Sequence, residues 1–249
     1  MILYFSGCGN SQFVATELAR ITGQGLRRID PLEETPELEL SEGEMLGVVC
    51  PVYAWSVPRL VDDYISRLQC GVKPGYLFLA VTCGDNVGHT PERFARTLAR
   101  RGWQLDSAFS FVMPETYINL PGFKLDTVEN VGRKVAAARE RLPKVAERIM
   151  NREKVIDVVR GSAPWLTSGL LNPLFYGLLI TDKKFRVTDG CISCGKCVEV
   201  CPLSNITLKE GKPQWHGSCT NCMACYHHCP KNAIHFGKAT LNKGQYFFN

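Results

Sequence analysis

The chain has 249 residues, of which 45% are hydrophobic and 21% are charged, and it contains 12 cysteines. This length allows one large domain or two smaller ones, and the apolar fraction excludes wholesale disorder and fibrous repeats. The first residues, MILYFSGCGNSQ, have no basic segment and no small-residue cleavage site, so no signal peptide is expected. Clustered cysteines without a secretory signal are typical of metal or redox sites in a reducing compartment.

Apolar runs alternate with amphipathic stretches along the first part of the chain. The pattern predicts strands at residues 1–6, 26–29, 45–53, 76–82 and 108–113, and helices at 11–21, 57–68, 91–101 and 126–152. Strands that alternate with helices indicate a parallel sheet covered by helices on both faces. Such sheets bind ligands beyond the C-terminal ends of their strands, where the strand order switches direction.

The first predicted strand runs into the sequence SGCGNS, which we call loop 1 (residues 6–11). Its glycines allow the backbone to approach an anion, and its N–H groups and the following helix favour a phosphate. A tight strand-to-helix turn without a ligand is the plainer alternative. No Walker A sequence is present. The dinucleotide pattern fits at Gly7 and Gly9 but has Gln12 at its third glycine, and Asp30 suits a ribose contact, so a nicotinamide nucleotide stays open.

Two later strands lead into PVYAWSVP, or loop 2 (residues 51–58), and TCGDNVG, or loop 3 (residues 82–88). With these three loops the chain resembles the flavodoxin family over residues 1–155. The resemblance implies a doubly wound sheet of five parallel strands in the order 2-1-3-4-5 that binds FMN, with the phosphate in loop 1 and the ring between loops 2 and 3. The residues it implies for FMN are Ser6, Gly7, Cys8, Gly9, Asn10, Ser11, Pro51, Tyr53, Ala54, Trp55, Thr82, Cys83, Gly84, Asp85, Asn86 and Gly88.

Individual residues in these loops suit a flat ring, although each also has a plainer explanation. Tyr53 and Trp55 offer aromatic faces for stacking, but Trp55 is equally explained as a surface aromatic. Asp85 and Asn86 either bond the ring or cap the next helix. Cys8 stands where flavodoxins usually have threonine, which removes a phosphate donor. Cys8, like Cys50 and Cys83, is expected to be a small apolar filler rather than a redox thiol.

The strongest signal is a repeat near the end of the chain. CISCGKCVEVCP (191–202) and CTNCMACYHHCP (219–230) share the pattern C-x2-C-x2-C-x3-C-P, offset by 28 residues. The repeat resembles the bacterial-type ferredoxin with two [4Fe–4S] clusters and covers residues 182–237. Because the fourth cysteine of each run ligates the other cluster in such ferredoxins, one cluster takes Cys191, Cys194, Cys197 and Cys229, and the other takes Cys219, Cys222, Cys225 and Cys201.

Other uses of these cysteines fit less well. A zinc site usually needs only paired CxxC knuckles, without a third cysteine at the same interval, and structural disulfides need an oxidising compartment. His227 and His228 lie inside the second run, but the cysteines already complete the ligand set. Both histidines are expected to be exposed.

Charge and hydropathy set limits on the partners. The formal net charge is +5. Two cluster assemblies at about −2 each and a flavin phosphate of up to −2 would bring it to about −1. No dense Lys/Arg stripe is present, so nucleic-acid binding is not expected. Residues 162–181 carry no charge, but their two prolines and two glycines favour packing between two domains over a membrane span or contact with a membrane surface.

The expected organisation is therefore a flavin domain (1–155), an apolar interdomain segment (156–181), a small α+β ferredoxin domain (182–237) and a tail (238–249). As a whole the chain looks like the fused flavodoxin–ferredoxin proteins of anaerobic prokaryotes. That resemblance implies a cytoplasmic electron carrier between redox partner proteins. The alternatives are a flavin-dependent oxidoreductase that reduces a small molecule or nicotinamide, with Tyr53, Cys83, Asp85 or His89 as proton donor, and a redox sensor that uses an acidic thiol such as Cys8 or Cys83.

Overall fold

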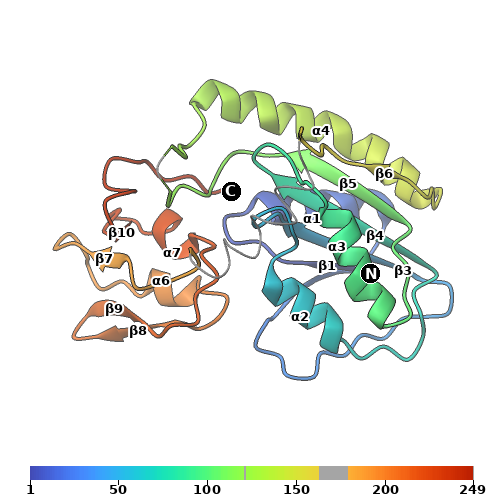
Figure 1. Cartoon of the computed structure of the whole chain (residues 1–249), viewed down its shortest axis with the longest axis horizontal. Helices are drawn as coiled ribbons and strands as arrows, with labels where there is room; N and C mark the ends of the chain where they lie inside the picture. Colours follow the sequence, from blue (N-terminus) through green and yellow to red (C-terminus); the bar gives the residue numbers. More distant parts are fainter. Residues whose placement is uncertain (121, 163–178, 249) are drawn as a thin grey trace.

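A computed structural model describes residues 1–120, 122–162 and 179–248. Its larger part contains a parallel sheet flanked by helices (Figure 1). The strands are β1 (Ile2–Tyr4), β2 (Leu26–Arg28), β3 (Met45–Pro51), β4 (Tyr76–Cys83), β5 (Ser107–Val112) and β6 (Ile156–Asp157). The helices are α1 (Asn10–Thr22), α2 (Arg59–Arg67), α3 (Thr90–Arg100) and α4 (Val128–Met150).

The sheet has the order β2-β1-β3-β4-β5-β6, and all its pairs are parallel. The expected order of the first five strands is confirmed, and it is that of a flavodoxin-like doubly wound sheet. The expected total of five strands is wrong, because β6 adds a sixth at the edge. This strand has only two residues, lies within the short stretch VIDVV (155–159), and leaves Ile156 44% exposed.

The helices form two layers. α2 and α3 pack on one face of the sheet through residues such as Tyr64 and Phe94, and α1 and α4 pack on the other through residues such as Leu18 and Leu142. All eight residues of β4 are buried, because helices cover both faces of this central strand. This burial explains the continuous apolar run YLFLAVTC. The sheet therefore offers ligands only its strand ends.

The cysteine-rich part lies beside the sheet and has two small antiparallel pairs (Figure 1). The strands β7 (Phe185–Val187) and β10 (Ile234–Phe236) form one pair, and β8 (Ile206–Lys209) and β9 (Lys212–Trp215) form the other. Two single-turn helices, α6 (Lys196–Glu199) and α7 (Ala224–His227), lie within the two cysteine runs. A separate hydrophobic cluster that includes Phe185, Tyr226 and Phe236 holds this part together, as expected for a small α+β domain.

Most of the apolar stretch predicted between the two parts falls in a range that the structure does not describe. Residues 163–178 lie outside the described residues, so the packing expected for residues 162–181 stays a prediction. In the described ranges 1–120, 122–162 and 179–248, no helix has the length and apolar character needed to cross a membrane.

Candidate functional site

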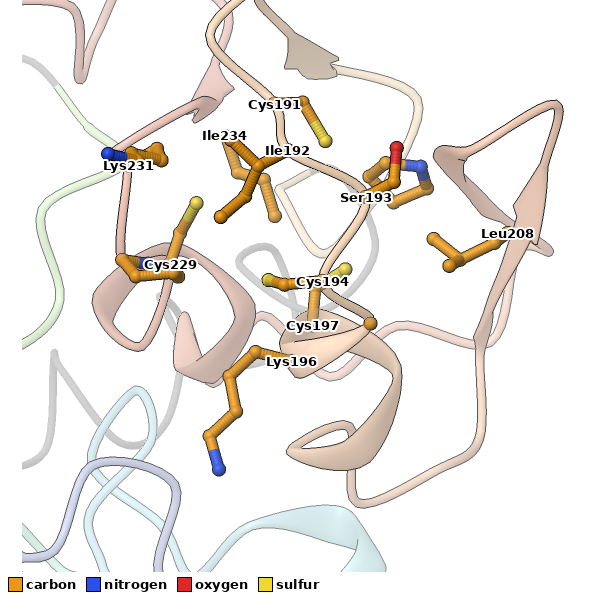
Figure 2. Close-up of a pocket in the computed structure, with 13 residues that line it drawn as sticks. Cys191, Ile192, Ser193, Cys194, Lys196, Cys197, Leu208, Cys229, Lys231 and Ile234 are labelled. Atoms are coloured by element: carbon orange, nitrogen blue, oxygen red, sulfur yellow. The ribbon is translucent and has the colours of Figure 1, made fainter.

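Four cysteines of the two runs surround one space, which we call cavity A. Cys191, Cys194, Cys197 and Cys229 line this cavity, and Figure 2 shows them around it together with Ile192 and Ile234. Three come from the first run and one from the second. This is the set that the ferredoxin resemblance assigns to one cluster.

The other four cysteines surround a second space, cavity B. This cavity is lined by Cys201, Cys219, Cys222 and Cys225. Among all the residues that the structure describes, no three His, Cys, Asp or Glu side chains lie close enough together to bind a single metal ion. This includes the cysteines of cavities A and B. The thiols instead stand around spaces large enough to be lined by more than ten residues each. Four thiols around each cavity match the four cysteine ligands that a [4Fe–4S] cluster takes.

The repeat extends to unusual backbone conformations. Residues with positive φ recur at the same 28-residue offset, in the pairs Ser193/Asn221, Gly195/Met223 and Ser204/Asn232. Five of these six are not glycine, and a left-handed conformation costs such residues free energy. Both halves therefore hold the same strained turns around their cysteines, which indicates that the turns serve the sites rather than the fold alone.

These turns direct backbone N–H groups at sulfur. The amide of Asn205 donates to Cys201 Sγ and the amide of Ala233 donates to Cys229 Sγ, each over 3.3 Å, and these two bonds are equivalent in the repeat. The amide of Asn221 donates to Cys219 Sγ over 3.3 Å as well. Donors of this kind orient thiolate ligands and stabilise their negative charge. Burial raises the pKa of Cys219 to about 12, so that thiol is protonated until a metal displaces its proton.

The three loops predicted to bind FMN meet at the ends of β1, β3 and β4. The Ser11 and Thr82 hydroxyls share a hydrogen bond of 2.8 Å, which joins loop 1 to loop 3. The amide of Val52 donates to Thr82 O over 2.9 Å, which joins loop 2 to loop 3. A side chain on Gly7 would come within 3.5 Å of the Tyr53 hydroxyl, so loops 1 and 2 are also neighbours. The predicted residues therefore gather at the switch point between β1 and β3.

The tip of loop 2 is a turn with a strained backbone at Ala54 and Trp55. Ala54 has φ 48° and Trp55 has φ 58°, although neither is glycine. Tyr53 and Ser56 exchange two backbone hydrogen bonds of 2.9 and 3.1 Å around them, and Arg93 Nε donates to Ser56 Oγ over 3.2 Å. Strain held in place by its surroundings is common in ligand-binding loops.

A cluster of charged side chains that no sequence motif predicts supports loop 3. Lys134 Nζ donates to Gly84 O over 3.0 Å and pairs with Asp126 over 2.7 Å, while Glu115 packs against Gly84 so closely that a side chain there would collide with it. Burial raises the pKa of the Glu115 carboxyl. Glu115 and Lys134 lie on a loop and a helix distant in sequence, so only the fold reveals this cluster.

The end of the chain covers loop 1. In the tail (residues 238–248), the Phe248 amide donates to Cys8 O over 2.8 Å, and the Tyr246 hydroxyl donates to Asn10 Oδ1 over 3.2 Å. Gly9 has φ 93°, and a side chain there would collide with the Phe248 backbone. The absence of a side chain at Gly9 therefore allows the tail to pack against loop 1. In this structure the tail lies where the sequence predicted the phosphate of FMN to bind.

The cysteine-rich part contacts loop 1 directly. Cys8 Sγ donates to Cys222 O over 3.5 Å, and a side chain on Gly7 would meet Cys222 Cβ at 3.1 Å. Leu203, which lines cavity B, packs against the same hydrophobic cluster as Tyr53. Cavity B is thus the cavity that adjoins the predicted flavin loops.

His227 connects the two parts, which contradicts the expectation that it is exposed. Its side chain is 1% exposed, its Nε2 lies 2.8 Å from Thr116 O, and its Nδ1 accepts the Tyr246 amide over 3.2 Å. The prediction is wrong because the loop that carries Thr116 and the tail that carries Tyr246, both remote in sequence, cover this side chain. His228 is half-buried and stacks on Phe247.

The scattered cysteines behave as apolar fillers. Cys8, Cys50 and Cys83 are buried, and burial raises the pKa of each thiol, to about 12 for Cys83. A protonated, buried thiol is a poor nucleophile and a poor target for oxidants. This result removes the lowered pKa on which a thiol-based redox sensor would depend.

Comparisons with known proteins bear on both parts. Residues 189–234 match the family model described as 4Fe-4S dicluster domain. A flavodoxin of Streptococcus pneumoniae TIGR4 is 16% identical, with 60% of this chain and 96% of that chain covered and a TM-score of 0.36. An FMN-dependent NADH-azoreductase of Bacillus anthracis str. Ames Ancestor, solved in complex with FMN, is 10% identical, with 60% and 98% covered and a TM-score of 0.35.

TM-scores this low carry no argument, so the fold of the larger part rests on its strand order. No curated protein matches the chain closely enough to count as a relative. The order β2-β1-β3-β4-β5-β6 and the family match at residues 189–234 are independent observations. The chain therefore combines a flavodoxin-like α/β fold with a C-terminal 4Fe–4S dicluster domain, whose eight cysteines imply two [4Fe–4S] clusters.

Proposed function

We propose that the protein is an electron carrier that relays electrons between FMN on loops 1 to 3 and two [4Fe–4S] clusters, on behalf of cytoplasmic redox partner proteins. The observation that carries this proposal is the contact between Cys8 of loop 1 and Cys222 of cavity B, at 3.5 Å. A dicluster domain packed on the ligand edge of a flavodoxin-like sheet puts a cluster next to the place where such sheets bind ligands.

The chain's own residues supply the positions and the environment. Cavity A uses Cys191, Cys194, Cys197 and Cys229, and cavity B uses Cys201, Cys219, Cys222 and Cys225. When bound, the clusters exchange single electrons and the flavin exchanges one or two, which joins one-electron to two-electron chemistry. Because Cys222 touches loop 1, cavity B is the inner site, and cavity A, where Cys194 is exposed, is the outer one.

The proposed flavin site has candidate ring contacts on loops 2 and 3 and needs movement at the phosphate end. Loops 2 and 3 hold Trp55 and Gly84 at the strand ends, as a ring site requires. The Phe248 backbone lies on Gly9, where the phosphate is expected. The proposal therefore requires that residues 245–248 move when FMN binds. Deletion of residues 245–249 is expected to speed FMN uptake by the apoprotein, which stopped-flow quenching of flavin fluorescence measures.

A cofactor inventory is the direct test. Protein purified without oxygen should contain about eight irons and one FMN per chain. Reduction of the flavin by a cluster should then follow a single addition of dithionite, monitored by the flavin absorbance. Protein that contains iron but takes up no flavin, with or without the tail, would refute the relay and leave a dicluster protein.

A second function, flavin-dependent reduction of a small molecule or nicotinamide, is favoured by one observation. The Glu115 carboxyl is buried beside loop 3 and has a raised pKa, so it is suited to hold a proton near the ring. Rapid bleaching of the flavin by NADH or NADPH alone, lost in Glu115→Gln, would establish this enzyme activity. Absence of bleaching, together with reduction through the clusters, supports the carrier.

A further inference from the structure

Trp215, the last residue of β9, carries a buried N–H group without a hydrogen bond. Its indole lines cavity B, and its Nε1 has no hydrogen-bond partner among the described residues. Nearly all buried donors in folded proteins have an acceptor, so an unpaired one at the wall of a cavity indicates a group that belongs inside it.

The indole is held in a fixed orientation beside the cysteines of cavity B. Its ring stacks on Phe185 with centroids 5.1 Å apart and planes inclined by 6°. The wall of the cavity that this ring lines also carries the four thiols of Cys201, Cys219, Cys222 and Cys225. A rigid donor beside a ligand sulfur needs no rearrangement to bind a thiolate or an inorganic sulfide.

This donor has no counterpart in the other half of the repeat. The backbone bonds to Cys201 and Cys229 are equivalent, but the position 28 residues before Trp215 is Val187. Among the residues that the structure describes, no tryptophan lines cavity A, and Lys196, which does line it, is paired with Glu199 over 2.7 Å and points away in Figure 2. Cavity B therefore has a buried indole N–H group at its wall that has no equivalent among the described residues of cavity A.

We propose that the Trp215 indole donates to the sulfur shell of the cluster in cavity B and raises that cluster's reduction potential. The inference rests on the proposed function, since it assumes a [4Fe–4S] cluster in cavity B. Reduction adds one electron and hence one negative charge to the cluster, with no proton or bond exchanged, and a fixed N–H dipole stabilises that added charge. The higher potential favours reduction of the cluster in cavity B, which adjoins loop 1, over reduction of the other cluster.

The test uses the full chain with both clusters, titrated with dithionite under argon and followed by electron paramagnetic resonance. In Trp215→Phe, the midpoint of one cluster should move to a more negative potential while the other stays unchanged. The loss of one hydrogen bond to a charged group corresponds to about a tenfold change in the equilibrium constant for electron transfer between the two clusters. Trp103→Phe, at a tryptophan buried in the α/β part, is the matched control and should shift neither midpoint.

A spectroscopic signature separates hydrogen bonding from packing. Reduced wild-type protein should show an exchangeable proton coupled to one cluster, lost in D2O and absent in Trp215→Phe. Should Trp215→Phe fail to assemble, benzothienylalanine at this position keeps the size and stacking of the ring but removes the N–H. Unchanged midpoints with about eight irons bound would overturn the role of Trp215 alone, whereas protein without clusters would overturn the proposed function.

Discussion

The thiol of Cys8 donates a hydrogen bond to the carbonyl oxygen of Cys222 over 3.5 Å, although 214 residues separate the two in the sequence. Gly7 makes this approach possible, because even a Cβ there would lie 3.1 Å from Cys222 Cβ. The first loop of the sheet and the second cysteine run thus form one surface. This contact decides which of the two cysteine cavities lies next to the proposed flavin site.

Replacement of Gly9 by alanine should release the tail. Gly9→Ala places alanine in a left-handed conformation and also makes its side chain collide with the Phe248 backbone. Gly23 has φ 66° and no neighbour within 4 Å, so Gly23→Ala is destabilised by the left-handed conformation alone. We expect Gly23→Ala to lower the free energy of unfolding by about 1 kcal/mol, and Gly9→Ala to lower it by clearly more. Urea denaturation measures both, and limited proteolysis should cut the tail only in Gly9→Ala. Equal losses would show that the tail does not press on loop 1.

Loss of one outer cysteine should remove one cluster and spare the flavin. Cys194 lines cavity A and is exposed, so Cys194→Ala is expected to lower iron content by about half without unfolding the α/β part. Cys70→Ala, at a partly buried thiol of the α/β part, should leave iron unchanged. Iron and flavin analysis of both variants checks this. Complete loss of iron in Cys194→Ala would mean that the two sites assemble only together.

Truncation of Trp55 should weaken the binding of FMN and leave the iron content unchanged. The turn at Ala54 and Trp55 accepts alanine at the same positive φ, so the change removes the ring without adding strain. If the indole stacks on the flavin, its loss should raise the FMN dissociation constant by about tenfold. Fluorescence titration of the apoprotein measures this constant. An unchanged constant would assign Trp55 to another contact.

The buried carboxyl of Glu115 should make stability depend on pH. Because burial raises its pKa above the usual value of 4.5, the folded chain keeps a proton that the unfolded chain releases. The free energy of unfolding therefore falls as pH rises from 4.5 until the folded-state pKa is passed. In Glu115→Gln this fall should be absent, since glutamine does not titrate but still accepts from the amides of Thr116 and Tyr117.

Denaturation across this pH range checks the prediction, with Glu147→Gln as the control. Glu147 is exposed on α4, so its removal should leave the pH dependence of the wild type in place. A Glu115→Gln variant with the wild-type pH dependence would show that other groups govern it.

The sequence by itself determined the local patterns. The apolar runs predicted β1, β3, β4 and β5, because strands buried on both faces need continuous hydrophobic residues, whereas the edge strand β2 has the sequence LRR and leaves Leu26 exposed. The spacing in the two cysteine runs predicted the dicluster domain that the family match at residues 189–234 shows. Both features depend on neighbours in the chain, which a sequence displays directly.

Only the tertiary structure decided how these parts meet. The contact of Cys222 with loop 1, the burial of His227 and the approach of Glu115 to Gly84 each join residues that are remote in sequence. The contact of the Phe248 backbone with Gly9 is also set by packing rather than by local pattern. Burial and pKa depend on what covers a side chain, and that is fixed only when distant segments pack together.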